Sequence, residues 1–473
     1  MSSLVKGSLL IVIGTIYRII ASLLIDKYLA INLGVESYGK YKYGITIVLI
    51  LSTICSLGFV SSIVRTVAIQ KGDYLKKKII TISLFLVLIF SIIVIFVITS
   101  GLLKINIDKY FQLASLFYAL NTLYVGIYSG MEKPKYKVFI NDFLGFTLYL
   151  LFLFAYFSLN INNEHIALVY LAYTFFVFIV NVLSSRNLYV KLKKEDIKIQ
   201  EVKSFFKYSF PLFWVSVLII LNNHVDKLIL NYFVSEKDLG IYFAVFNISN
   251  LLPLILTILL FLYLPKVSKF IEEGKFKKVI LINSYSSKWT MIIASVFFGI
   301  ILYHSKSLLM LLYSVEFVQG DFILKVLAFG QWINVSLGFT GQNLLAYGDS
   351  KSQLYIRLAS FILSSLLLFF GVKYLGNLGA AIAILFVLLF SNIAQIAVLR
   401  IKHNFIGYKS QNIYAVIIVI IIGFMLFFMH KLEIFQRINF IVLIIIDIVI
   451  FISLLIFTKV LNKKDVKILK VIG

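Results

Sequence analysis

The chain has little of what soluble proteins use to stabilise their folds. Among its 473 residues are one cysteine, four prolines and 21 acidic residues. A single cysteine, Cys55, allows no internal disulfide and supports no thiolate metal cluster. No polar segment is long enough to form a separate catalytic domain. These shortages exclude a disulfide-stapled scaffold and disfavour an enzyme with a soluble catalytic domain.

Long hydrophobic runs are what the chain has instead. It is 61% hydrophobic and 16% aromatic, with a mean hydropathy of +0.99. A run of about 20 apolar residues is long enough for a helix to cross the hydrocarbon core of a membrane. The sequence therefore predicts an all-α membrane protein with about fourteen transmembrane helices. They are expected near residues 6–31, 44–69, 79–103, 110–131, 136–160, 165–190, 205–233, 239–265, 279–304, 322–347, 352–375, 377–402, 411–430 and 438–459. The first of these has no small-residue cleavage pattern after it, so we expect a membrane helix rather than a cleaved signal.

The net charge of +24 is distributed unevenly among the connections between these segments. With the N-terminus inside, the inward connections carry about three Lys or Arg residues for each one in the outward connections. That bias is the positive-inside rule, so both termini are predicted to be cytoplasmic. Contact with anionic lipid headgroups accounts for the excess charge, and a nucleic-acid partner is not predicted.

A short pattern occurs twice, at an offset of 226 − 26 = 200 residues. Asp26-Lys27 precedes Gly39-Lys40-Tyr41, and Asp226-Lys227 precedes Gly240-Ile241-Tyr242. A looser pair follows at Tyr128 and Tyr347, so a duplication is indicated. Six helices per copy would make two parallel lobes. The predicted organisation is an N-terminal lobe at 1–190, a cytoplasmic linker at 191–204, a C-terminal lobe at 205–402, and two extra helices with a basic tail at 403–473.

Charged residues within the apolar runs are the candidate binding groups, because a charge in the bilayer usually faces a cavity or a partner. Arg18 stands out because Gly14, Ala21, Ser22 and Ile25 share its helical face, and these small or partly polar residues suit a cavity lining. The other basic candidates are Arg65, Lys288, Lys325 and Arg357, whereas Asp447 is the one deep carboxylate expected. A basic cavity would suit a lipid phosphate or pyrophosphate, which arginine binds through its fork of donors.

Other searches predict no metal site and no cofactor. The five histidines are scattered, and His224 near Asp226 is interpreted as a polar pair. The glycine-rich stretch from Gly34 to Lys40 matches a phosphate loop only superficially. Tyr41 stands where that loop needs Ser or Thr, and no strand precedes it.

Several motifs resemble those of polysaccharide-unit flippases, including O-antigen flippases, of the multidrug/oligosaccharidyl-lipid/polysaccharide exporter superfamily. The stretch from Leu33 to Tyr41 looks like the Leu-Gly-x-x-x-Tyr-Gly-x-Tyr pattern of the family. Ser56-Leu57-Gly58-Phe59 followed by Arg65 is similar to the end of its second helix. A third match runs through Pro211-Leu212, Asp226-Lys227 and Leu239-Gly240-Ile241-Tyr242.

The resemblance implies two six-helix lobes around a central cavity, and export of lipid-linked oligosaccharide by alternating access. The protein would lie in the cytoplasmic membrane of a prokaryote, with a glycan polymerase or glycosyltransferases as candidate partners. In this hypothesis Arg18 and Arg65 hold the phosphate, with Lys288 and Arg357 as weaker candidates. The sugar path would be lined by Tyr17, Asn121, Asn222 and Asn334.

Two alternatives remain. A cation-coupled multidrug exporter of the same fold would need a functional carboxylate at Asp26, Asp142 or Asp447. A membrane glycan polymerase or ligase would need a sizeable outward loop with catalytic residues. The longest outward connection, 305–321, is itself half apolar, so this third hypothesis is the weakest.

Overall fold

The hydrophobic runs form helices, since a helix satisfies its own backbone hydrogen bonds where lipid offers none. The computed structural model describes residues 3–70, 72–101, 107–190, 199–432 and 438–461, and these contain helices and no β-strand. Among them, ten helices are long and apolar enough to cross a membrane, or eleven with the bent pair Leu10–Cys55 and Phe59–Ile69. The predicted all-α membrane class is confirmed, with a lower count of spans than fourteen.

The count differs mainly because two very long helices continue through a glycine turn. Helix α1 (Ser3–Cys55) contains Gly34 at φ 72°, and α14 (Ser350–His403) contains Gly376 at φ 56°. Both glycines adopt a backbone conformation that residues with a Cβ rarely reach. The predicted segments 352–375 and 377–402 are thus the two halves of α14. Helix α4 (Lys109–Gly130) matches the predicted segment 110–131 but is not apolar enough to count among the ten.

The chain divides into two units, Met1–Leu228 and Ile229–Gly473. The division falls inside α8 (Ile199–Phe233). Most of the predicted linker 191–204, and most of the basic tail beyond residue 461, lie outside the described residues. The lobe boundaries drawn from the sequence therefore remain a prediction.

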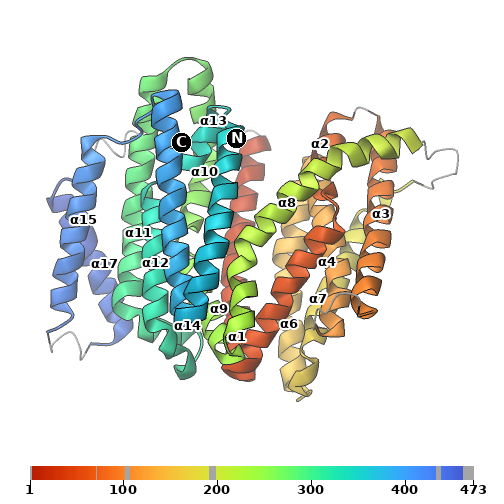
Figure 1. Cartoon of the computed structure of the whole chain (residues 1–473), viewed down its shortest axis with the longest axis horizontal. Coiled ribbons are helices and arrows are strands. Elements are labelled where there is room, and N and C mark those ends of the chain that lie inside the picture. The colour runs from red at the N-terminus through yellow and green to blue at the C-terminus, as the bar shows by residue number, and fades with distance from the viewer. Residues whose placement is uncertain (1–2, 71, 102–106, 191–198, 433–437, 462–473) are drawn as a thin grey trace. The chain divides into compact units, whose positions relative to one another are not determined.

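In the first unit, α4 is the central helix. It packs against α1, α2 (Phe59–Ile69), α3 (Asp73–Thr99) and α7 (Ala167–Ser184) (Figure 1). Buried apolar side chains fill these contacts, among them Cys55, Phe59, Tyr124 and Tyr128. The cysteine is free and buried, as a small hydrophobic residue would be.

One span of the first unit contains a π-helix, which is wider than an α-helix. The span consists of α5 (Pro134–Tyr136), the π-helix η1 (Lys137–Leu144) and α6 (Gly145–Ser158). Short 3₁₀ turns, η2 (Asn163–His165) and η3 (Arg186–Leu188), flank α7. Wide turns of this kind often occur at functional sites, because they redirect side chains within an otherwise regular helix.

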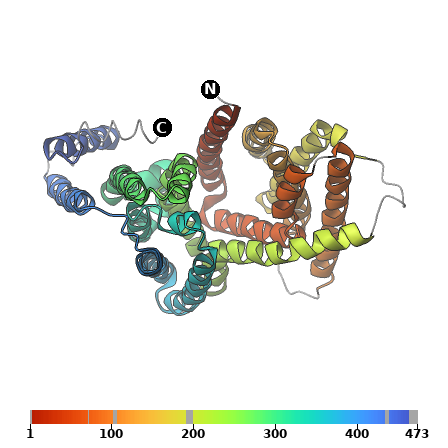
Figure 2. The same ribbon diagram turned by 90° about the horizontal axis from the view of Figure 1, so that it is seen from above.

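In the second unit, α12 (Asp321–Ser336) packs against α9 (Glu236–Ser249), α11 (Phe276–Leu312) and α14. Helix α10 (Leu254–Glu272) and α13 (Thr340–Ala346) complete the group, and η5 (Val315–Gly320) links α11 to α12. Helices α15 (Ser410–Met429) and α17 (Phe440–Phe457) pack against α11 and against each other (Figure 2). The predicted segment 239–265 is divided between α9 and α10, and Pro253 is the N-cap of α10.

Helix α14 folds back on itself at Gly376. The carboxylate of Asp349, before its first residue, accepts a hydrogen bond from the Ser352 amide and lies 3.3 Å from His403 Nε2, at the other end. The hydrogen bonds from Ser352 hold the pKa of Asp349 at about 2. Both ends of α14 therefore meet at one carboxylate.

The repeated pattern occupies buried positions in both copies. Tyr41 is 2% exposed and Tyr242 is fully buried. Asp226 pairs with its neighbour Lys227 at 2.9 Å. Asp26 pairs at 2.8 Å with Lys42, because the turn at Gly34 brings the next helix alongside.

Candidate functional site

The first unit encloses a polar cavity of about 470 Å³, within the range of small-molecule sites. Helices α1, α2, α4, α6, α7 and the π-helix η1 line it, and all of the described residues in its lining belong to the first unit. Five charged side chains face this cavity: Arg18, Asp26, Lys42, Lys137 and Asp142.

One face of α1 supplies the first wall. Arg18, Ser22 and Ile25 line the cavity, as their helical spacing predicts. Asp26 continues the same face one turn further on. Beyond the turn at Gly34 the chain returns and adds Lys42 to the lining.

The π-helix supplies the opposite wall. Lys137, Asn141 and Asp142 all lie in η1, and all three line the cavity. Asp142 is 6% exposed. An i to i+5 helix places residues 137 and 142 one turn apart, so both charges can face the same side.

The charges in the cavity form one close pair and one loose pair. Lys42 Nζ lies 2.8 Å from Asp26 Oδ1, and both side chains are largely buried. Arg18 Nη1 lies 3.8 Å from Asp142 Oδ1, and the Arg18 side chain is 49% exposed. The contact at 3.8 Å is too long for a hydrogen bond, so the guanidinium keeps donors for an anion in the cavity.

The expectation that the deep charges are basic, apart from Asp447, was wrong in this unit. Asp26 and Asp142 are buried and face the cavity together with three basic residues. The predicted segments 6–31 and 136–160 place Asp26 and Asp142 near helix ends. In the structure α1 runs on past Asp26 to Cys55, and Asp142 lies within the η1 span. With all five groups ionised, the cavity carries one net positive charge.

Amide and aromatic groups form the rest of the lining. Asn121, predicted for the sugar path, faces the cavity, but its Nδ2 donates to the Thr174 carbonyl and its Oδ1 accepts from Asn181 Nδ2. Tyr149 and Tyr173 stack with ring centroids 5.0 Å apart and line the cavity with Tyr118 and Tyr170. Aromatic faces of this kind are available for stacking against a sugar or another ring.

Three predicted residues of the first unit do not line this cavity. Arg65 is exposed on α2, with its guanidinium 4.8 Å from the centre of the Tyr208 ring. The Tyr17 hydroxyl lies 2.6 Å from Thr147 Oγ1. Asn222 is exposed on α8.

The remaining predicted residues belong to the second unit. Lys288 is buried in α11, 5.9 Å from the centre of the Tyr285 ring. Arg357 is exposed on α14, and Lys325 pairs with Asp321 at 3.1 Å. Asn334 Oδ1 accepts a hydrogen bond from Asn392 Nδ2 at 2.9 Å, within a buried polar network.

The sequence missed Lys42, Lys137, Asn141 and the tyrosines as lining residues. A signal was present in η1, where a lysine, an asparagine and an aspartate follow each other at positions 137, 141 and 142 of an apolar span. Polar residues at helical spacing within such a span predict a polar face. The tyrosines gave no signal, because the chain has 28 of them.

The second unit has a cavity of another character. Its volume is about 700 Å³, and its lining is almost wholly apolar. Helices α11, α12, α14, α15 and α17 form its walls, and Phe298, Trp332 and Phe424 are among the aromatic residues that face it. Asp447 contributes one of the few charges.

Comparison with known proteins identifies the family. A family model described as polysaccharide biosynthesis protein matches residues 4–271, which is more than half of the chain. The chain belongs to this family. The match includes the whole polar cavity, and the predicted resemblance to polysaccharide-unit flippases is confirmed at the level of the family.

Relatives and solved structures agree with this assignment. The capsular polysaccharide biosynthesis protein CapF of Staphylococcus aureus is 25% identical over 357 residues, which are 74% of this chain and 87% of CapF. The lipid II flippase MurJ, in an inward closed conformation, matches 97% of this chain and 99% of its own, with a TM-score of 0.73 and 14% identity. An inward-facing multidrug resistance MATE family transporter of the MOP superfamily matches 82% of this chain and 94% of its own, with a TM-score of 0.66 and 15% identity. These two structures share the fold of this multi-pass membrane protein.

Proposed function

We propose that the protein is a flippase that moves a polyprenyl-(pyro)phosphate-linked oligosaccharide from the inner to the outer leaflet of the cytoplasmic membrane. It would do so by alternating access between two parallel lobes of six spans each, with two further C-terminal spans. Both termini would lie in the cytoplasm. The glycan would then pass to a polymerase or glycosyltransferases of surface polysaccharide assembly. We propose transport as the whole of its activity, with no catalytic step.

The observation that carries this proposal is the position of Arg18. It lies on the wall of a polar cavity in an apolar protein, half exposed, and 3.8 Å from its carboxylate neighbour. An arginine that is always charged and keeps free donors is suited to bind a phosphate. The family assignment supplies the context of polysaccharide synthesis.

The polar cavity of the first unit offers suitable surroundings for the polar end of such a substrate. Arg18, Lys137 and four tyrosines in its lining suit a phosphate and the sugars next to it.

The predicted site residues divide by their positions. Arg18 is the principal phosphate ligand of the proposal. Arg65, exposed near the predicted cytoplasmic side, would meet the phosphate before it enters. Lys288 and Arg357 remain weaker candidates, as do Tyr17, Asn222 and Asn334 for the sugar path. Tyr149 and Tyr173 are better placed than these three for contact with sugars in the cavity.

Transport of a labelled lipid-linked glycan in proteoliposomes tests the proposal. We expect the Arg18→Ala, Arg65→Ala double variant to lose transport by at least about ten- to a hundredfold, because the charge-assisted hydrogen bond from Arg18 alone is worth about 1.5–3 kcal/mol. Arg18→Lys should retain part of the rate, since it keeps the charge but loses the fork of donors.

The matched control is Arg186→Ala, which removes an exposed arginine of the same unit outside the cavity. It should transport at the wild-type rate. Full transport by the double variant would disprove the phosphate site. Absence of transport by the wild-type protein, with a range of lipid-linked glycans, would contradict the flippase itself.

A cation-coupled drug exporter is the second candidate, and the buried carboxylates Asp26 and Asp142 in the cavity favour it. Such an exporter would expel a fluorescent organic cation when a proton or sodium gradient is applied. It would lose that activity on substitution of Asp142→Asn. If the protein exports the dye, needs the ion gradient and Asp142 to do so, and transports no glycan, it is a cation-coupled exporter and not a flippase.

A further inference from the structure

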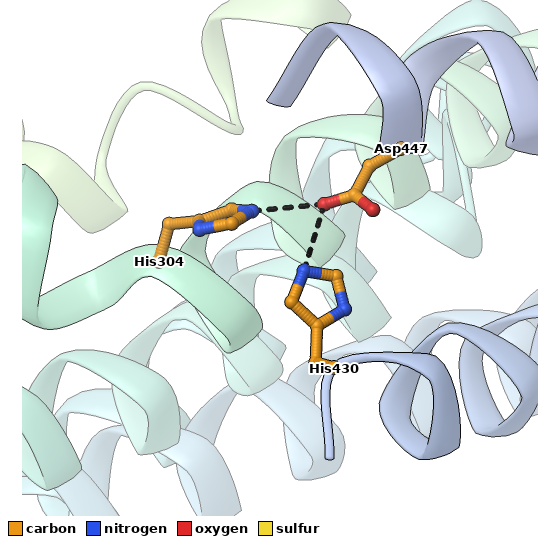
Figure 3. Close-up of side chains that lie close together, drawn as sticks. All are labelled: His304, His430 and Asp447. Atoms are coloured by element: carbon orange, nitrogen blue, oxygen red, sulfur yellow. Dashed lines mark hydrogen bonds and ion pairs between the residues drawn. The ribbon is translucent and has the colours of Figure 1, made fainter. Parts of the chain in front are cut away.

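A second cluster of charged and metal-binding side chains lies in the second unit. We propose that His304, His430 and Asp447 bind one divalent transition-metal ion of the zinc class. The three side chains come from α11, the end of α15 and the middle of α17, and they converge on one point (Figure 3). One candidate ligand atom from each residue lies within 4.8 Å of the others.

The first argument is the burial of a carboxylate in an apolar helix. Asp447 is 6% exposed and is the one ionisable residue of α17, whose sequence is otherwise hydrophobic apart from one serine. A carboxylate inside a membrane costs several kcal/mol unless a cation compensates it. The nearby Lys325 is paired with Asp321 at 3.1 Å. Among the described residues, the side chains that pair with Asp447 are the imidazoles of His304 and His430.

The second argument is the tautomer of His430. Its Nδ1 lies 2.9 Å from the carbonyl oxygen of Leu426, so Nδ1 carries the hydrogen and donates it. In the neutral ring, Nε2 then presents a lone pair. That lone pair faces Asp447 Oδ2 at 3.3 Å, and two lone pairs that face each other repel. A cation between Nε2 and Oδ2 turns the repulsion into two attractive contacts.

The third argument is that a metal ion fits this cluster of three side chains better than protons do. His304 Nε2 approaches the same Oδ2 at 2.8 Å, so two imidazole nitrogens and one carboxylate oxygen meet. One divalent ion satisfies all three ligand atoms at once, whereas without a metal ion both Nε2 atoms must carry a hydrogen, which makes His430 a cation because its Nδ1 also carries one. Two histidines and one carboxylate are a frequent ligand set for zinc, with one position left for water. The bond from His430 Nδ1 to a backbone carbonyl is the usual way in which a ligating imidazole is oriented.

The distances to the carboxylate are close to those of a metal site. Ligand atoms around a tetrahedral zinc ion lie roughly 3.3 Å apart. The two nitrogens are 2.8 and 3.3 Å from Oδ2, and all three ligand atoms lie within 4.8 Å of one another. His304 stands at a kink in α11, with φ −118° and ψ 16°, and Tyr303 stacks on the His430 ring at 4.9 Å. Both rings are therefore held in position by their surroundings.

The site would join α15 and α17 to α11. These two helices lie outside the predicted duplication and contact the rest of their unit mainly through α11. A metal ion shared by the three helices would fix the position of the pair. The site also borders the apolar cavity, since Asp447 lines it.

Metal binding by the full-length wild-type protein is the decisive measurement. The protein is purified in detergent with a tag that contains no histidine, stripped with a chelator, and titrated with Zn²⁺ against a fluorescent competitor. We expect one ion per chain. X-ray absorption of the loaded protein should show two imidazoles and one or two oxygens near 2.0 Å, the distance typical of zinc ligands. No stoichiometric binding, or a spectrum without imidazole, would overturn the proposal without recourse to any variant.

Variants locate the site. Asp447→Asn and His430→Gln should each weaken binding at least about a hundredfold, while His165→Gln, an exposed histidine of the first unit, should leave it unchanged. Size-exclusion profiles of the metal-free proteins show whether each variant is folded. If Asp447→Asn binds Zn²⁺ like the wild type, the site is elsewhere and the assignment fails. If the wild type binds no metal but loses thermal stability as the pH rises through the range of histidine, the cluster is held by protons instead.

Discussion

At the scale of single residues, the charges of the first unit differ in how firmly they are held. Lys42 and Asp26 form a short, largely buried pair, whereas Arg18 is half exposed and only loosely paired with Asp142. A buried pair depends on both members, because the loss of one leaves a buried charge. The first pair therefore maintains the shape of the cavity, and Arg18 is the group with capacity for a ligand.

We expect Lys42→Met to destabilise the protein by about 3–5 kcal/mol, since it removes one member of a largely buried ion pair and leaves the other. The double variant Lys42→Met, Asp26→Asn should recover most of that loss. Thermal unfolding in detergent measures both.

The exposed pair of Lys77 and Asp73, at 2.8 Å on α3, is the control. Lys77→Met should cost less than about 1 kcal/mol. Equal losses for Lys42→Met and Lys77→Met would mean that the Lys42 pair is not structurally important.

At the scale of elements, glycine turns decide how the longest helices fold back. The two halves of α14 meet so closely near Gly376 that a Cβ on Gly379 would lie 1.8 Å from the carbonyl oxygen of Gly371. Side chains larger than hydrogen do not fit there. The π-helix η1 has a comparable effect in the first unit, where it directs Lys137 and Asp142 to one cavity.

Gly379→Ala should therefore destabilise the protein by about 1–3 kcal/mol or more, because the added methyl group meets backbone that cannot move freely. Gly299→Ala is the control. Its Cβ would lie 3.9 Å from the nearest atom, in the ring of Tyr303, and alanine is the better helix former. Equal unfolding temperatures for the two variants would show that the halves of α14 can separate without cost.

At the scale of the whole molecule, the proposed transport of an anionic substrate would be driven in part by the membrane potential. An anionic substrate that leaves an inside-negative cell gains about 2.3 kcal/mol per charge for each 100 mV. The net charge of +24 and its inward bias agree with a cytoplasmic face that attracts anionic lipids.

We expect outward transport of the lipid-linked glycan to accelerate when an inside-negative potential is imposed on proteoliposomes by a potassium gradient with valinomycin. Collapse of the potential should slow it. An exporter of organic cations would respond in the opposite sense, since the potential opposes the outward movement of positive charge. A rate that falls with increasing inside-negative potential would thus contradict the transport of an anion.

The sequence by itself determined that this protein lies in a membrane, that it is all-helical, and which family it resembles. Apolar runs of about 20 residues leave a helical membrane protein as the outcome, because lipid satisfies no backbone hydrogen bond. The helical spacing around Arg18 also placed Ser22 and Ile25 beside it on the cavity wall, whereas Gly14 and Ala21 of the same predicted face are not part of the lining.

Only the tertiary structure decided which distant residues meet. Asp26 pairs with Lys42 because the chain turns back at Gly34, and Asp142 lies near Arg18 because the π-helix directs its side chain there. His304 and Asp447, which are 143 residues apart in the sequence, are also in contact. These contacts depend on where a helix bends and which of its faces packs inward, and periodicity alone specifies neither. The same long-range packing left Arg65 outside the cavity that Arg18 lines. Side chains that share a helix face are set by local geometry, whereas sites built from several helices exist only once those helices have packed.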